Sequence, residues 1–203
     1  MRARGILALG RIGYADLPLL AGELLADPTI PVRQAAADAL ANFGSRAAAG
    51  ALVLKLRTGD DEPLVILSCV AALLEVAPEW GLDAARSMLF GRDASAREVA
   101  AVALGQSSRD DALALLLDAL AVSAISVDRA AFFTGMGLHR SERARAALVD
   151  VISGASEPDA RAAVAALGAA RFEPGLEARV RDAASRNKRA NLAEALAFAF
   201  PPA

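Results

Sequence analysis

Small and apolar residues recur at helical spacing in the stretch 27–44, DPTIPVRQAAADALANFG. The positions of its apolar face are Val32, Ala35, Ala36, Ala39, Leu40 and Phe43. This i, i+3, i+4, i+7 pattern predicts an amphipathic helix with one buried face. The prolines before it favour a turn and a first helical turn, and Gly44 favours a C-terminal stop. The stretch therefore predicts a turn followed by an Ala-rich helix.

The same pattern returns along the chain with a step of 32 residues. Two series at this step are apolar throughout: Leu20, Leu52, Ala84, Leu116, Leu148, Val180 and Leu24, Leu56, Met88, Leu120, Ile152, Ala184. The second helix of each unit is marked at the same step by Arg33, Val65, Arg97, Arg129 and Arg161, with Val65 as the exception. Such a register predicts an all-α solenoid of about six helix pairs of ~32 residues.

We expect one continuous solenoid over residues 1–203. It would consist of a partial N-terminal repeat at 1–13, six helix pairs within 16–199 and a tail at 200–203. The N-terminal helix lacks a first-helix partner, which predicts an exposed apolar end. One interpretation is that self-association covers this end, and the dependence of light-scattering mass on concentration tests it.

The unit Leu17–Gly44 resembles a HEAT repeat of the short, Ala-rich bacterial kind, similar to the phycobilisome-lyase HEAT-like group. The resemblance lies in the apolar first helix, the Asp-Pro turn, the Val-Arg pair and the AAxxAL second helix. It implies an armadillo-like, right-handed α-α superhelix. It also implies an Asp–Arg ladder between repeats, which Asp27 and Arg33 match and to which we assign Arg161. Because HEAT arrays serve many roles, the resemblance specifies fold better than function.

Composition narrows the classes of partner. The net charge of −2 offers no general attraction to nucleic acid or to an anionic membrane surface. No stretch approaches the ~20 apolar residues of a membrane span, and the start MRARGILALGRIG lacks a convincing signal-peptide core. We therefore expect a cytoplasmic protein. The single cysteine, Cys69, excludes an internal disulfide and is expected to be a buried, inert thiol.

In the HEAT family the second helices line the concave surface, which is the usual binding face. Superimposing the second helices predicts an apolar strip flanked by charges on this face, the pattern of an interface hot spot. The predicted partner-binding residues are Ile66, Val70, Arg97, Glu98, Val102, Arg129 and Phe133. The alternative is that a one-residue register shift in 64–76 turns several of them inward, with Phe132 and Phe133 both in the core.

Trp80 follows a proline in the segment 78–81, which we expect to be a loop between helix pairs. It would either pack down as a local anchor or form a surface contact.

Catalysis has little support in this sequence. The one histidine, His139, leaves no multi-histidine metal site, and no cofactor motif is apparent. Metal-dependent hydroxylases built from HEAT repeats use several His-Glu pairs, which are absent here. We therefore expect no metal, no cofactor and no enzyme activity, but a scaffold that binds a peptide or protein. The alternative is a bilin lyase-like or chaperone-like protein, which a shift in the visible absorption of added bilin would reveal.

Overall fold

The computed structural model describes residues 1–123 and 126–201. Over those residues the chain forms thirteen α-helices and one 3-10 turn, and it contains no strand. The chain divides into two compact units, Met1–Ala103 and Leu104–Ala203. The predicted all-α fold is therefore confirmed. No helix in the described ranges is both long enough and apolar enough to cross a membrane.

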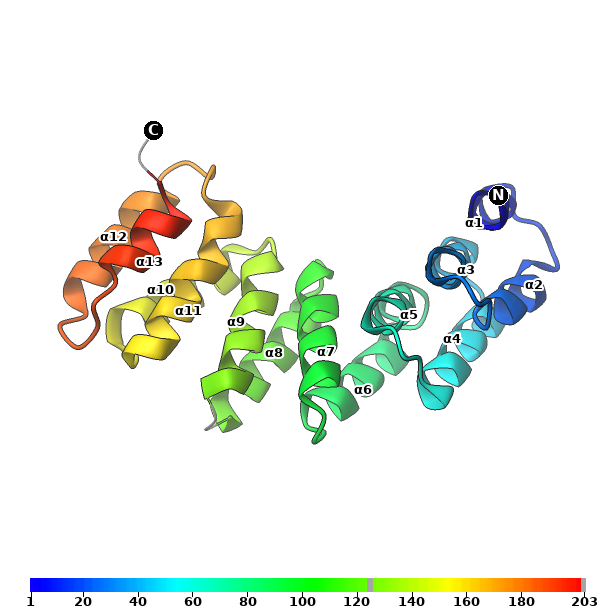
Figure 1. The fold of residues 1–203 in the computed structure, drawn as a ribbon, viewed down its shortest axis with the longest axis horizontal. Coiled ribbons are helices and arrows are strands. Elements are labelled where there is room, and N and C mark those ends of the chain that lie inside the picture. The colour runs from blue at the N-terminus through cyan, green and yellow to red at the C-terminus, as the bar shows by residue number, and fades with distance from the viewer. Residues whose placement is uncertain (124–125, 202–203) are drawn as a thin grey trace. The chain divides into compact units, whose positions relative to one another are not determined.

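Helices of the first unit alternate between two layers (Figure 1). They are α1 (Arg2–Arg11), α2 (Leu17–Leu24), α3 (Ile30–Phe43), α4 (Arg46–Thr58), α5 (Pro63–Val76), α6 (Pro78–Leu89) and the start of α7 (Ala94–Gln106). The helix α3 packs against α1 and α5 in one layer, while α2 packs against α4 in the other. Each helix of one layer also packs on its sequence neighbour, so that α2 contacts α3 and α4 contacts α5. This is the HEAT-like arrangement of helix pairs that the sequence predicts.

The second unit repeats this plan. Its helices are the end of α7, α8 (Asp110–Val122), α9 (Ser126–Leu138), α10 (Glu142–Gly154), α11 (Glu157–Leu167), η1 (Gly168–Ala170), α12 (Leu176–Arg186) and α13 (Ala193–Ala199). One layer is built by α11, which packs against α9 and α13, and the other by α10 against α12.

Local sequence signals explain the ends of several helices. Gly44 ends α3 with a φ of 67°, a left-handed conformation that favours glycine. The hydroxyl oxygen of Ser45 then accepts a hydrogen bond from the Ala48 N–H at the start of α4 (3.1 Å). The prediction of a stop at Gly44 is thus confirmed.

Two predicted features near helix ends need correction. The segment 78–81 is not a loop but the first turn of α6, because Pro78 can occupy a first-turn position that needs no N–H donor. We expected both Phe198 and Phe200 to fold back over the last helix. Phe200 is buried, but Phe198 is 88% exposed. Residues 202 and 203 of the predicted tail lie outside the described residues.

Alanine and leucine form most of the buried core in both units. In the first unit the core includes fully buried Ala36, Leu40, Leu52 and Leu73. Small residues allow helices to approach closely: a Cβ on Gly105 of α7 would lie 2.1 Å from the Gly135 carbonyl oxygen of α9. The core is therefore built on close backbone approach rather than on large side chains.

Candidate functional site

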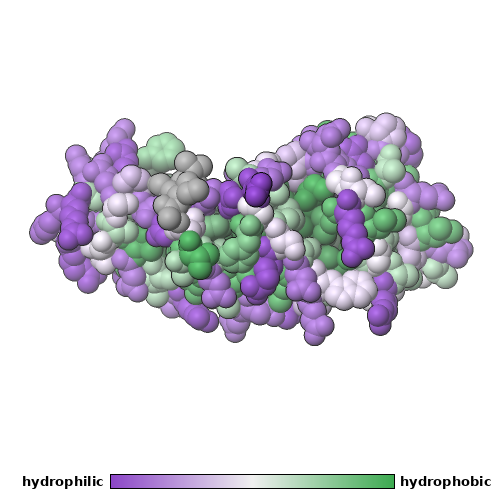
Figure 2. Space-filling model, turned by 90° about the horizontal axis from the view of Figure 1, so that it is seen from below, coloured by the Kyte–Doolittle hydropathy of each residue, from purple (hydrophilic) through white to green (hydrophobic). Residues whose placement is uncertain are grey.

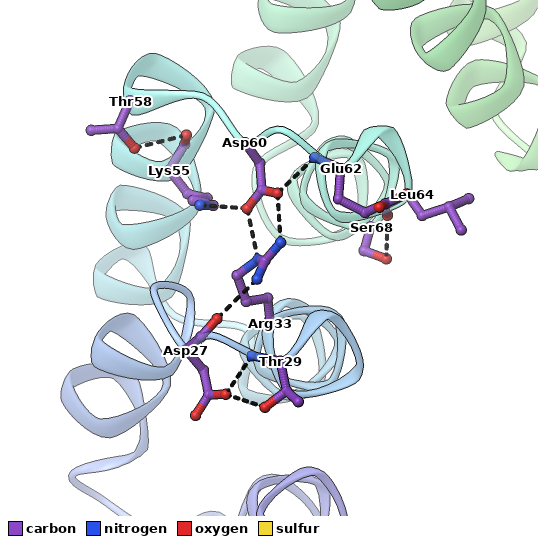
Figure 3. Close-up of polar contacts among 9 residues, drawn as sticks. All are labelled: Asp27, Thr29, Arg33, Lys55, Thr58, Asp60, Glu62, Leu64 and Ser68. Atoms are coloured by element: carbon purple, nitrogen blue, oxygen red, sulfur yellow. Dashed lines mark hydrogen bonds and ion pairs between the residues drawn. The ribbon is translucent and has the colours of Figure 1, made fainter.

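A bidentate ion pair joins successive turns of the first unit (Figure 3). The Nε and Nη2 atoms of Arg33 each lie 2.8 Å from a carboxylate oxygen of Asp60, and Nη1 donates to the backbone carbonyl of Asp27 (2.9 Å). Lys55 approaches the same carboxylate at 2.7 Å. We call an arginine that binds the carbonyl of its own turn and a carboxylate of the next turn a rung.

A similar rung recurs in the second unit. Arg129 lies 2.8 Å from the Asp159 carboxylate and donates to the carbonyls of Leu120 (3.0 Å) and Ser123 (3.1 Å). Simpler pairs have the same sense along the chain, with Arg2 at 2.6 Å from Asp27 and Arg161 at 2.8 Å from Glu194.

The predicted ladder paired Arg33 with the carboxylate of its own turn, and this detail is wrong. Arg33 binds only the backbone carbonyl of Asp27. The Asp27 carboxylate instead accepts hydrogen bonds from the N–H and hydroxyl of Thr29, and it pairs with Arg2. A carboxylate two residues before the helix is short enough to bind its own turn, which leaves the arginine to reach the next one.

Electrostatics make Asp60 the most strongly held carboxylate of this ladder. Burial acts to raise its pKa, but hydrogen bonds from Lys55, Arg33 and the Glu62 N–H outweigh it and lower the pKa to about 2. Asp60 is therefore ionised in the folded protein at neutral pH.

The turn, not a constant step, sets the register between α3 and α5. The helices begin after Thr29 and Glu62, which are 33 residues apart rather than 32. Ile66 therefore occupies the place of Arg33, because each N–H bonds to the carbonyl four residues earlier, at the residue that precedes its helix. Val65 corresponds to Val32, and both are buried. The assumption that Val65 replaces an arginine is thus wrong by one position.

The predicted concave strip fails at two of its residues. Val70 and Phe133 are fully buried, so neither can contact a partner. The shift of one residue turns Val70 into the core at the position of Ala37, which is also buried. Phe133 packs inward with Phe132, and the Arg129 guanidinium carbon lies 5.6 Å from its ring centroid.

The other predicted contact residues have different surroundings. Arg97 is half-buried and donates to the carbonyls of Leu89 (3.2 Å) and Gly91 (2.8 Å). Glu98 is exposed and Val102 is half-buried. Ile66 is half-buried and lines a groove that the sequence did not predict.

This groove lies in the first unit, where α4 and α6 do not pack closely as α2 and α4 do. Its volume is about 720 Å³, within the range of roughly 300–1,000 Å³ of ligand pockets. The lining residues are Val53, Leu56, Arg57, Gly59, Asp60, Ile66, Trp80, Asp83, Ala84, Ser87, Met88, Asp93 and Ala96. We call this the α4–α6 groove. Figure 2, seen from the side on which α4 and α6 lie in Figure 1, shows apolar residues between hydrophilic ones.

Chemically, the α4–α6 groove combines an apolar floor with an acidic edge. Val53, Leu56, Ile66 and Met88 are half-buried and supply aliphatic surface. Trp80, which is 37% exposed, adds an aromatic wall with the Arg46 guanidinium carbon 5.6 Å from its ring centroid.

Three aspartates and one arginine line the α4–α6 groove. Asp60 is already paired, while Asp83 and Asp93 are exposed. The groove can therefore hold an apolar side chain beside a cationic one.

The sequence contains signals for parts of this groove. Trp80 was recognised as a candidate surface residue, and Leu56, Ala84 and Met88 belong to the apolar repeat series. These series predict buried helix faces, so they gave no reason to expect an opening between two neighbouring helices.

A second, smaller hollow of about 330 Å³ lies between α9 and α11. Its lining consists of Ala130, Thr134, Gly137, Leu138, Ala162, Ala165, Ala166 and Ala169. It offers one hydroxyl and no charge, so it has fewer means of holding a partner than the α4–α6 groove.

His139 is buried and connects two loops of the second unit. Its Nδ1 accepts a hydrogen bond from the Ser141 N–H (3.3 Å), and its Nε2 donates to the Arg109 carbonyl (3.1 Å). The Ser141 hydroxyl oxygen lies 2.9 Å from Nδ1 and also accepts the Ala144 N–H at the start of α10 (3.2 Å). This Ser–His pair thus fixes a loop and a helix end. The described residues contain no cluster of three or more metal-binding side chains.

Comparison with known proteins identifies one similar solved structure to report. Human deoxyhypusine hydroxylase, solved in complex with glycerol, is 18% identical over a match that covers 98% of this chain and 77% of that one, with a TM-score of 0.45. No protein-family model matches the chain, and no curated protein matches it.

Proposed function

We propose that this chain is a noncatalytic binding scaffold that takes a peptide segment of a protein partner in the α4–α6 groove. The observation that carries the proposal is the open space of about 720 Å³ between two helices whose counterparts elsewhere pack together. Its apolar floor and exposed Trp80 are features of interface hot spots, in which aromatic and aliphatic side chains bury most of the contact. The acidic edge favours a segment that also carries positive charge.

This surface replaces the concave strip as the expected contact. The groove is formed by the first helices of two pairs, together with the two turns that follow them. Peptide recognition by such a groove needs side-chain anchors rather than an open sheet edge, since the helices satisfy their own backbone groups.

Selection from a phage-displayed library of random dodecapeptides tests the proposal. Trp80 is the only tryptophan of the chain, so its fluorescence reports binding in the groove directly. Selected peptides should shift this fluorescence in wild type, and Ala84→Arg should weaken binding at least tenfold because it fills the groove. The matched control is Leu54→Asp, on the same α4 but 63% exposed and outside the lining. Circular dichroism checks that each variant folds.

The opposite result is equally clear. Peptides that bind Ala84→Arg as well as wild type, or a library that yields no groove-binding peptide, would overturn the proposal. A shift in the visible absorption of free bilin on mixing with the protein would instead favour the bilin lyase-like alternative. Arg97 and Arg129, which we had considered as partners for bilin propionates, both donate to backbone carbonyls.

A further inference from the structure

The α4–α6 groove includes the place where a rung is missing. In α3, the fourth residue after the helix-preceding Thr29 is Arg33, which binds the Asp27 carbonyl and reaches the next turn. In α5, the fourth residue after Glu62 is Ile66. An isoleucine has no donor, so the Asp60 carbonyl does not receive the bond that Arg33 gives to its equivalent, the carbonyl of Asp27.

The next rung along the chain is present again. Arg97 is the fourth residue after Asp93, and it donates to the Gly91 carbonyl of its own turn (2.8 Å). The interruption at Ile66 is therefore local, with guanidinium groups at the same position in the pairs before and after it.

Acidic groups remain around the interruption. The groove lining brings together Ile66, the turn residues Gly59 and Asp60, and the carboxylate of Asp93. That carboxylate accepts the Ser95 N–H (2.9 Å) and stays exposed to the groove. Asp83 of α6 lines the same space, and it is also exposed.

We propose that the partner segment inserts an arginine side chain beside Ile66, where it supplies the missing rung from outside the chain. Its guanidinium would bind the Asp93 carboxylate and the turn carbonyls, while its neighbours cover Met88 and Trp80. This inference rests on the proposed function, because it names the side chain that the groove accepts. An arginine fits better than a lysine, since its planar fork can bind a carboxylate and a carbonyl together and can stack on an aromatic ring.

Tripeptide probes test this directly through Trp80 fluorescence. Acetyl-Leu-Arg-Leu-amide should shift the emission, and the citrulline analogue, which keeps the shape but lacks the charge, should bind at least fivefold more weakly. Asp93→Asn should remove this difference, because it keeps the Ser95 bond but not the charge. Asp61→Asn, on the neighbouring turn and outside the lining, is the matched control.

A variant of the chain itself supplies a second, ligand-free test. Ile66→Arg should restore the rung from within, raise the thermal midpoint and abolish binding of the arginine tripeptide. Ile66→Met, of similar length but without a donor, should do neither.

The outcomes separate the two proposals. Arginine and citrulline probes of equal affinity that are both blocked by Ala84→Arg would overturn the arginine inference and leave the groove function in place. An Ile66→Arg protein no more stable than Ile66→Met would also overturn it. If neither probe and no selected peptide shifts the fluorescence, both proposals fail.

Discussion

Arg33 and Asp60 form a two-point ion pair between consecutive turns, with Nε and Nη2 each 2.8 Å from a different carboxylate oxygen. The Asp60 side chain is 4% exposed and that of Arg33 is 14% exposed. Charge-assisted bidentate pairs are among the stronger hydrogen-bonded contacts, and this one connects residues 27 positions apart. The pair therefore links one helical repeat to the next at the turn.

The first prediction concerns acid. The folded pKa of Asp60 is about 2, because hydrogen bonds from Lys55 and Arg33 outweigh the opposing effect of burial. An aspartate in an unfolded chain has a pKa of about 3.9. Since the folded value is lower, Asp60 contributes stability that is complete above about pH 4 and is lost as the pH falls toward 2. Thermal midpoints of wild type should therefore fall more steeply across this range than those of Asp60→Asn.

At neutral pH, Asp60→Asn should lower the free energy of unfolding by about 1.5–3 kcal/mol, the usual contribution of a hydrogen bond to a charged group. The exposed neighbour Asp61 provides the control, and Asp61→Asn should change it by less than about 0.5 kcal/mol. Identical acid profiles for wild type and Asp60→Asn would show that the pair does not hold in solution.

The second prediction distinguishes a core from a surface phenylalanine. Phe133 is fully buried, so Phe133→Ala should cost about 3–5 kcal/mol in urea unfolding through lost burial and the cavity it leaves. Thr134→Ala, one residue further and exposed, should stay within about 0.5 kcal/mol. A Phe133→Ala protein as stable as wild type would restore the interpretation of Phe133 as a surface contact.

Two glycines should respond to alanine in opposite directions. Gly105→Ala places a Cβ 2.1 Å from the Gly135 carbonyl oxygen, so the two helices must move apart at a cost of about 1–3 kcal/mol or more. Gly50 lies within α4 with no atom within 4 Å of an added Cβ. Gly50→Ala should therefore stabilise the chain by up to about 1 kcal/mol through helix propensity. Calorimetry that finds the same sign for both would contradict the close approach at Gly105.

The fourth prediction concerns the only thiol. Burial raises the pKa of Cys69 to about 12, and the side chain is fully buried. Because the thiolate is the reactive form, a disulfide reagent near pH 8 should modify the folded protein at least about 1,000-fold more slowly than the urea-denatured protein. Rapid modification without denaturant would mean that α5 opens readily or that Cys69 is accessible.

Much of the helical architecture could be predicted from local sequence. The pattern from Val32 to Phe43 repeats with the period of a helix, and turn residues such as Gly44 punctuate it, so the pairs could be placed within a few residues. These signals act over one or two turns of helix. They do not require knowledge of the rest of the chain.

The candidate site could be predicted only in part. A fixed step of 32 residues misplaced Ile66 by one position, because the turn before α5 is one residue longer than that step allows. A shift of one residue rotates a helical position by about 100°, enough to exchange the buried Val70 for an exposed neighbour. The groove itself depends on the separation of α4 from α6, which no short stretch of sequence specifies.

The alanine-rich core has a consequence for how the protein responds to temperature. An alanine side chain removes only one methyl group from water when it is buried, far less than a leucine or a phenylalanine. The heat capacity increment of unfolding grows with the apolar surface exposed, and it averages about 12–15 cal/mol/K per residue in globular proteins. A core of this kind favours a value below that average. The stability curve would then be shallow, with folding held nearly constant across a broad range between cold and heat denaturation.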